Sequence, residues 1–141
     1  RLWRAALDGD DLTSVEVCGR GAGAVTNPPL VDPERGFVLG FDSANGVLAA
    51  FRTDTLALVW STELATAQHL MLYPDTGEVL ADAFEPGVGD ALVGVDIETG
   101  EVRCRADIGS PAQSVVFGAP GAHRDAYYAS LTTVARVEFG D

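Results

Sequence analysis

The feature that most constrains the fold is a segment that occurs twice, at a spacing of 44 residues. The later copy, Gly94–Arg105, reads G-V-D-I-E-T-G-E-V-R-C-R, and the earlier copy, Ala50–Trp60, reads A-F-R-T-D-T-L-A-L-V-W. Self-similarity at a fixed period of this length is typical of repeat architectures, in which each copy is one supersecondary unit. The sequence therefore predicts a fold that is assembled from copies of one unit.

The later copy has the pattern of a β-hairpin. Apolar and polar residues alternate on both sides of Glu98–Gly100, and Gly100 can take the positive φ that a tight reversal needs. We therefore expect two strands, Ala91–Ile97 and Glu101–Ile108, joined by this turn.

Residues 8–27 are predicted to be mostly connection, with one apolar alternation at Ser14–Cys18. From Pro28 onward, short strands of the same kind are predicted along the rest of the chain. They form two sets of four and one set of three: Leu30–Asp32, Phe37–Phe41, Val47–Arg52 and Ala57–Leu64; His69–Tyr73, Glu78–Phe84, Ala91–Ile97 and Glu101–Ile108; Ser114–Ala119, Ala126–Leu131 and Val134–Phe139. Turns rich in Gly, Pro, Asn and Asp separate them. Helical periodicity is absent apart from a brief ambiguity around Thr62–Leu72, so the predicted class is all-β.

Residues 28–60, P-P-L-V-D-P-E-R-G-F-V-L-G-F-D-S-A-N-G-V-L-A-A-F-R-T-D-T-L-A-L-V-W, resemble a repeat of the pyrroloquinoline-quinone-like (quinoprotein-type) β-propeller superfamily. The repeat of that family ends in the pattern Ala-x-Asp-x-x-Thr-Gly-x-x-x-Trp. The earlier copy keeps Trp60 but has Leu56 in place of Gly. The later copy keeps Asp96 but has Cys104 in place of Trp. The resemblance extends over residues 28–139.

The resemblance implies a fold of β-propeller blades, about three of them, each a four-stranded antiparallel sheet. Blade-like units are expected at about 28–64, 65–108 and 109–141 of a single segment spanning 1–141, with residues 1–7 as an outer strand. Known propellers have about four to eight blades, so these blades are expected to be part of a larger ring. The expected partners are further propeller blades from the same longer chain, or a second copy in a homodimer that completes the ring.

The charge of the chain is strongly one-sided. There are 21 acidic residues against 9 basic ones, all of them Arg, and the net charge is −12. Such a surface repels phosphate backbones, which excludes nucleic acid as an expected partner. Because no apolar run approaches the ~18 residues that a membrane helix needs, no membrane span is expected either.

Candidate ligand-binding residues lie just before the first predicted strand of each set. Three of them are carboxamides, Asn27, Gln68 and Gln113, and two of these are followed by His69 and Ser114. The resemblance implies that the first strand of each blade lines a central channel, so these side chains are expected at its mouth. Carboxamides donate and accept hydrogen bonds, which suits a small polar ligand. The alternative is that they cap strand starts and hold ordered water.

Known catalytic patterns are absent from the sequence. There is no H-E-x-x-H, and no Ser-His-Asp or Cys-His pair is suggested by spacing. The prediction is a non-enzymatic binding or scaffold module, with a protein or small polar ligand at the channel mouth or rim. No cofactor is predicted, because neutral oxygens alone hold Ca²⁺ weakly; Ca²⁺ stays open as an alternative that needs carboxylates from further blades. Two alternatives remain open: a quinone-dependent oxidoreductase, or a metal-dependent hydrolase, since Ser114–Gly121 resembles the gluconolactonase/regucalcin type of propeller.

Overall fold

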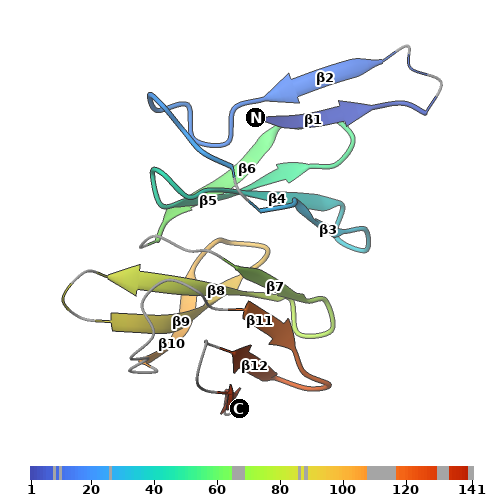
Figure 1. Ribbon diagram of the computed structural model, residues 1–141. Helices are drawn as coiled ribbons and strands as arrows, with labels where there is room; N and C mark the ends of the chain where they lie inside the picture. Colours follow the sequence, from blue (N-terminus) through green and yellow to red (C-terminus); the bar gives the residue numbers. More distant parts are fainter. Residues whose placement is uncertain are drawn as a thin grey trace. The chain divides into compact units, whose positions relative to one another are not determined.

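The computed structural model describes residues 1–7, 9, 11–25, 27–64, 69–85, 87, 89–107, 117–129 and 134–139. Within these ranges the chain forms thirteen β-strands and no helix (Figure 1). The predicted all-β class is therefore confirmed. It follows that the described residues include no helix of the length and apolarity needed to cross a membrane.

The chain divides into two compact units, Arg1–Leu64 and Ala65–Asp141. The strands of the first unit are β1 (Leu2–Ala5), β2 (Leu12–Val15), β3 (Leu30–Asp32), β4 (Phe37–Asp42), β5 (Val47–Arg52) and β6 (Leu58–Glu63). Those of the second unit are β7 (Leu70–Tyr73), β8 (Glu78–Glu85), β9 (Gly89–Asp96), β10 (Val102–Asp107), β11 (Phe117–Pro120), β12 (Asp125–Ala129) and β13 (Val134–Glu138).

The first unit contains a four-stranded antiparallel sheet of order β3-β4-β5-β6, which we call sheet I, and a two-stranded hairpin of β1 and β2. Leu2 and Val17 pack against Ala49 and Phe51 of sheet I. Gly40 makes room for this contact, because a Cβ atom there would lie 3.0 Å from Val17 and 3.1 Å from Leu2. The hairpin thus covers one face of sheet I.

The N-terminal region differs from the sequence-based expectation. Residues 8–27 are expected to be mostly connection, but they contain β2, which pairs with β1 in the register Leu2↔Val15 to Ala5↔Leu12. The four residues of β2 are too few to give a clear alternating pattern, and their strand conformation depends on pairing with β1. The role of residues 1–7 as an outer strand of a further blade stays a prediction.

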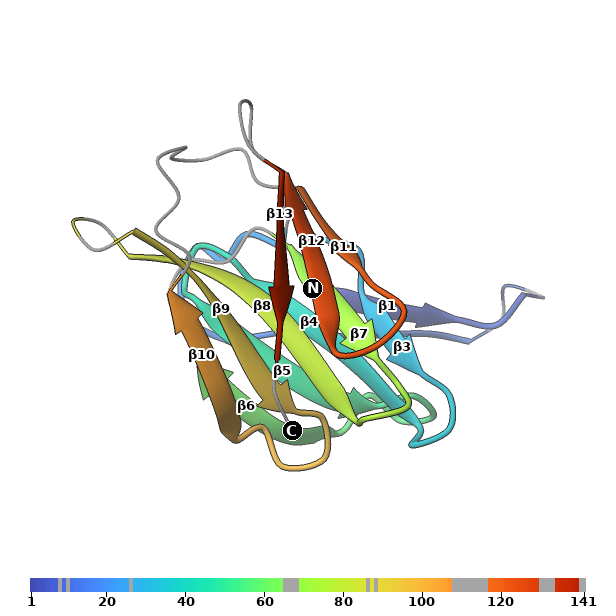
Figure 2. The same ribbon diagram turned by 90° about the horizontal axis from the view of Figure 1, so that it is seen from below.

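The second unit contains a four-stranded antiparallel sheet of order β10-β9-β8-β7, which we call sheet II, and a three-stranded sheet of order β11-β12-β13, which we call sheet III. Met71 and Leu92 of sheet II form a core cluster with Ala126 and Tyr128 of sheet III. At Gly118 of β11, a Cβ atom would lie 3.0 Å from Met71, so the missing side chain lets β11 approach sheet II. Sheets II and III lie face to face in both ribbon views (Figures 1 and 2).

The turns of sheets I and II share one backbone conformation, a residue with positive φ. Gly36, Gly46, Gly77 and Gly100 close their turns with φ between 64° and 76°. Leu56 takes φ 56° at the place in the first repeat that Gly100 occupies in the second. The departure from the family pattern at Leu56 therefore leaves the turn conformation unchanged, although a side chain rarely adopts it.

Candidate functional site

Two of the predicted ligand-binding residues lie within the described residues. Asn27 precedes β3 in the first unit, and His69 precedes β7 in the second. Both strands lie at one end of the order of their sheets, as expected for strands that line a channel. Gln68, Gln113 and Ser114 lie outside the described residues. The grouping of these five residues around one mouth stays a prediction.

Asn27 has a side-chain nitrogen without a hydrogen-bond partner in the described residues. This Nδ2 atom is buried. A buried donor without a partner costs about 1–3 kcal/mol. Asn27 can therefore donate a hydrogen bond to a water or to a polar ligand.

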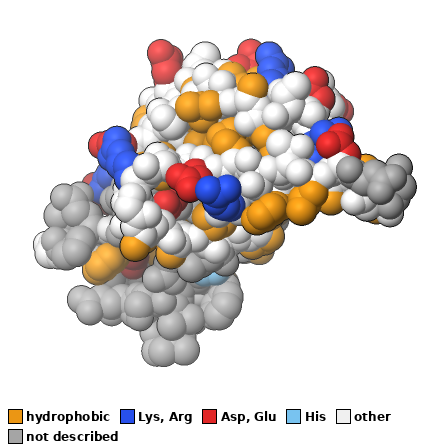
Figure 3. All heavy atoms as spheres, turned by 90° about the horizontal axis from the view of Figure 1, so that it is seen from above, with side chains coloured by type: hydrophobic (Ala, Val, Ile, Leu, Met, Phe, Trp, Pro, Cys, Tyr) orange, Lys and Arg blue, Asp and Glu red, His pale blue; other side chains and the backbone are white. Residues whose placement is uncertain are grey.

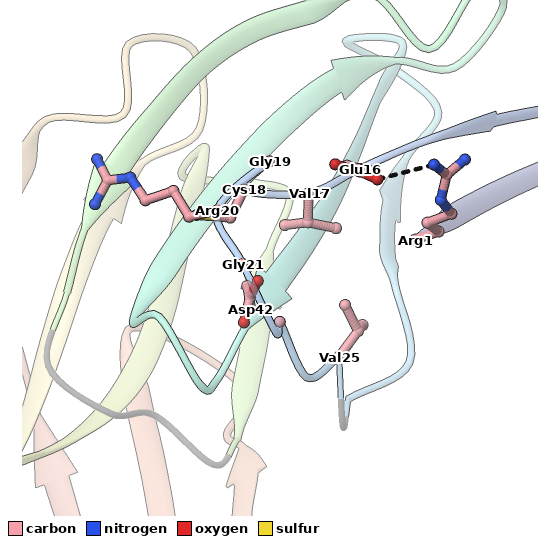
Figure 4. Close-up of a pocket in the computed structure, with 10 residues that line it drawn as sticks. Arg1, Glu16, Val17, Cys18, Gly19, Arg20, Gly21, Val25 and Asp42 are labelled. Atoms are coloured by element: carbon pink, nitrogen blue, oxygen red, sulfur yellow. Dashed lines mark hydrogen bonds and ion pairs between the residues drawn. The ribbon is translucent and has the colours of Figure 1, made fainter.

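A pocket of about 190 Å³ in the first unit is lined in part by the loop of residues 19–23, which contains three glycines (Figure 4). The charged groups that line it are occupied by other residues. Arg1 binds Glu16 at 2.8 Å, and Arg20 extends away from the pocket to bind Glu63 at 2.6 Å. Asp42 accepts hydrogen bonds from the backbone nitrogen of Ala24 and from the side chain of Asn45, so these groups have structural partners already.

A larger pocket, of about 420 Å³, lies in the second unit between the β7–β8 turn and the β11–β12 turn. Tyr73, which lines it, donates a hydrogen bond from its hydroxyl group to the backbone oxygen of Asp125 at 2.6 Å. Arg124, at its rim, binds Glu78 through two hydrogen bonds of 2.8 Å. These contacts hold the two turns together, which gives the polar groups of this pocket a structural role as well.

Six acidic side chains are buried in the described residues, and four of them have clear partners. Asp32, which ends β3, accepts hydrogen bonds from the backbone nitrogens of Glu34 and Arg35 and from the Arg35 side chain. Asp42 does the same for its turn through Asn45. The remaining two of these four, Glu78 and Asp125, bind arginines: Glu78 pairs with Arg124 and Asp125 with Arg136.

These partners determine the charge state of the four acids. At Glu78, burial favours the neutral acid, but hydrogen bonds from Arg124 and Thr76 and the charges of Arg124 and Arg103 outweigh it, so the pKa lies below its ordinary value. At Asp32, burial is likewise outweighed by Arg35, and the pKa is lowered. These acids are therefore ionised at neutral pH, and they stabilise turns.

The other two buried acids are Asp82 on β8 and Asp90 on β9. They lie toward the end of sheet II that is opposite to Glu78. Each is 4% exposed. Neither Oδ1 of Asp82 nor Oδ2 of Asp90 has a hydrogen-bond partner in the part of the chain that the structure describes. Burial, and then the charge of Asp90, raises the pKa of Asp82 to about 7.

His69 lies next to this acid pair. The backbone nitrogen of Asp82 donates to the backbone oxygen of His69 at 3.1 Å, so the two residues are opposite each other across β7 and β8. Burial lowers the pKa of His69, which favours its neutral form. The end of sheet II thus combines a neutral imidazole with two carboxyl groups, a set that can bind and release protons.

The acid pair is the feature that sequence analysis missed. A signal was available, because Asp82 interrupts the apolar alternation Leu80-Ala81-Asp82-Ala83-Phe84 at a position that should face the core. Asp90 gave no comparable signal, since it lies next to turn residues. No group of three or more His, Cys, Asp or Glu side chains that could hold a metal ion occurs among the described residues.

Four-stranded antiparallel meanders that repeat along a chain, with a further sheet packed face to face, are the blades of a β-propeller. The comparison with solved structures agrees. The chain matches the crystal structure of BamB from Moraxella catarrhalis with a TM-score of 0.53 and 19% sequence identity. The match covers 82% of this chain and 37% of that one, so the chain spans well under half of the length of BamB.

The structural match confirms the predicted fold class of propeller blades. At this level of sequence identity the likeness extends to the fold alone. No model of a protein family matches the chain, and no curated protein matches its sequence.

Proposed function

We propose that the chain is a segment of a β-propeller of the pyrroloquinoline-quinone-like superfamily, and that it works as a non-enzymatic binding or scaffold module. Its ligand or partner, a protein or a small polar molecule, binds at the channel mouth or on the rim, and no resident cofactor is needed. The observation that carries this proposal is an exposed apolar residue at the same place on the outermost strand of both repeats. Leu58 on β6 is 58% exposed, and Val102 on β10 is 51% exposed.

The equivalence of these two residues matters because strands at the end of a sheet are usually protected by charged side chains. Leu58 and Val102 are separated by the 44-residue period of the repeat. An isolated exposed apolar residue needs no explanation, but one that recurs on the outer strand of successive blades supports a contact surface on the rim.

Both units also expose apolar side chains on a sheet face, which supports further blades as partners. In the first unit Trp3 and Leu12 are exposed on the N-terminal hairpin, and in the second Tyr127 and Val134 are exposed on sheet III. The face seen from above in Figure 3 shows hydrophobic side chains between acidic and basic ones. We propose that blades from the same longer chain cover such faces; a second copy of this chain is the alternative.

The test is an NMR titration of the ¹⁵N-labelled chain with monosaccharides, with acidic and basic peptides, and with millimolar Ca²⁺. Shifts around Leu58 and Val102 that disappear in Leu58→Ser would support binding at the rim, and shifts around His69 and Asn27 that disappear in Asn27→Ala would support binding at the mouth. The exposed Asp75→Asn serves as the matched control for both. Ca²⁺-dependent hydrolysis of a lactone, or oxidation of an added alcohol or sugar coupled to reduction of an added quinone in the same sample, would overturn the proposal.

A further inference from the structure

The acid pair of sheet II has a defined geometry. In the β8–β9 ladder, Asp82 is opposite Leu92 and Phe84 is opposite Asp90. Side chains two positions apart on a strand point to the same face, so Asp82 and Asp90 are diagonal neighbours on one face of sheet II. This is the face that carries Leu92 of the core cluster and packs against sheet III.

Burial and the charge of Asp90 are the causes of the raised pKa of Asp82, and no arginine is among them. The two arginines on this side of sheet II, Arg103 and Arg124, both bind Glu78, which lies four residues from Asp82 along β8. The other titratable groups that share this face are His69 next to β7, Tyr73 on β7, Asp96 on β9, Cys104 on β10 and Tyr128 on β12. The facing part of β11 contributes Gly118, which brings no charge.

Two carboxylates in this setting cannot both be ionised without a large penalty. Each is buried, each has an oxygen without a hydrogen-bond partner in the described residues, and their charges repel. A single proton removes the repulsion and turns one acid into a donor for the other. The cost of an unpartnered buried carboxylate is therefore avoided when the pair carries one proton.

We propose that Asp82 and Asp90 share one proton in the folded chain, and that release of this proton to solvent as the pH rises past neutral loosens the end of sheet II that carries His69. The pair is a pH-sensitive device, and it goes beyond the binding or scaffold role proposed above. Proton binding is the only chemical step, so no other reactant is needed.

The direction of the effect follows from linkage. The pKa of Asp82 is raised from 3.8 to about 7 on folding, so the folded chain binds more protons than the unfolded chain between these values. Stability therefore falls as the pH rises through this window and levels off above it. A shift of this size corresponds to a change of roughly a thousand-fold in the folding equilibrium constant.

The direct experiment is a titration of the side-chain carboxyl carbons of the intact chain by NMR. We expect Asp82 to titrate near the value given above, and Asp90→Asn to lower its pKa by removing the neighbouring charge while burial remains. Titration of Asp82 within the ordinary range of an exposed aspartate would overturn the proposal.

The stability experiment uses Asp82→Asn, which has the shape of the protonated acid but cannot ionise. Between about pH 5 and pH 8 we expect the folding equilibrium constant of the native chain to fall by up to about a hundred-fold, and that of the variant to stay nearly constant. The exposed Asp75→Asn is expected to keep the native slope. Equal slopes for all three chains would overturn the proposal.

A bound cation is the main competing explanation, so both chains are also measured with millimolar Ca²⁺ at pH 8. No effect of Ca²⁺ on the native chain supports the shared proton. A Ca²⁺-induced gain in the stability of the native chain that Asp82→Asn abolishes would overturn it. If Asp82→Asn fails to fold, the carboxyl titration of the native chain decides by itself.

Discussion

Sheets I and II have the same strand order and equivalent registers, but they fill equivalent positions with different chemistry. Phe41 is opposite Leu48 in sheet I, and Asp82 is opposite Leu92 at the same place in sheet II. The position that holds a fully buried aromatic ring in one sheet thus holds a buried carboxyl group in the other.

A second difference in side-chain chemistry lies at the other end of the two sheets. In sheet I, Phe37 is opposite Arg52, whose guanidinium lies 4.9 Å from the centre of the ring. In sheet II the equivalent residues are Glu78 and Asp96, two acids that share Arg103 as a partner. An acidic pair is compatible with this end of sheet II because arginines reach it.

The comparison shows what determines the state of a buried acid in this protein. Glu78 and Asp82 lie on the same strand and the same face, and both are 4% exposed. Arginine partners lower the pKa of Glu78, whereas the pKa of Asp82, which has none, is raised. The partners of each acid, rather than its depth, decide whether it is charged at neutral pH.

The largest effect is expected when the acid of sheet II is placed at the equivalent position of sheet I. We expect Phe41→Asp to lower the free energy of unfolding of the first unit by at least about 4 kcal/mol, because a large buried ring is lost and a carboxyl group is buried. Tryptophan fluorescence during urea unfolding reports on this unit, since Trp3 and Trp60 are the only tryptophans. Phe41→Leu is the control, with an expected loss of about 1 kcal/mol. Equal midpoints for the two variants would contradict the expectation.

Removal of Arg124, which binds Glu78, should make the surroundings of Glu78 more like those of Asp82. Arg124→Ala leaves the more distant Arg103, at 3.8 Å, as the remaining arginine beside Glu78, and we expect a loss of about 2 kcal/mol at neutral pH. Amide hydrogen exchange in β8 and β9 measures it.

The effect of Arg124→Ala should also depend on pH in the direction opposite to that of the acid pair. Because the pKa of Glu78 is lowered on folding, its ionised carboxylate stabilises the folded chain fully above its ordinary pKa. This stabilisation is lost as the pH falls through the pKa that Glu78 has in the folded chain. The difference between Arg124→Ala and the native chain should therefore shrink below about pH 4. The exposed pair of Arg105 with Asp107 provides the control, Arg105→Ala, whose expected effect is at most about 1 kcal/mol.

A third variant tests a packing contact that differs between sheets I and II. Ala50 is opposite Trp60 in sheet I, and its equivalent Gly94 is opposite Cys104 in sheet II. A Cβ atom at Gly94 would lie 2.5 Å from the sulfur of Cys104, so we expect Gly94→Ala to cost about 1.5 kcal/mol through overpacking. Thermal unfolding measures the loss, and Cys104→Ala in the same chain should recover most of it. A double variant no more stable than Gly94→Ala would show that the sulfur is not the obstacle.

The smallest effect is expected at the exposed end of sheet I. Arg52→Ala removes the contact with the ring of Phe37 and should cost about 0.5 kcal/mol, the value of a cation–π pair at an exposed site. Urea unfolding followed by tryptophan fluorescence measures this loss, with Arg52→Lys as the charge-conserving control. A loss above about 2 kcal/mol would mean that Arg52 does more than stack on Phe37.

Most strands and turns of sheets I and II could be predicted from the amino-acid sequence alone. The 44-residue period, the alternating apolar residues and the turn glycines predicted the strands of sheets I and II, and a strand such as Val47–Arg52 agrees with β5 at both ends. Such features depend on interactions between neighbouring residues, so they can be recognised in a single sequence. The class of propeller blades was implied by the resemblance of residues 28–139 to a known repeat, and the structural match confirms it.

The tertiary structure decided the features that depend on residues far apart in the chain. The strand conformation of β2 comes from pairing with β1, a partner that the short alternation at Ser14–Cys18 did not identify. The meeting of Asp82 and Asp90 beside His69 depends on the β7–β8 and β8–β9 registers and on the absence of an arginine at that end. Pairing register and burial determine whether a polar side chain has a partner, and neither is present in the residue itself.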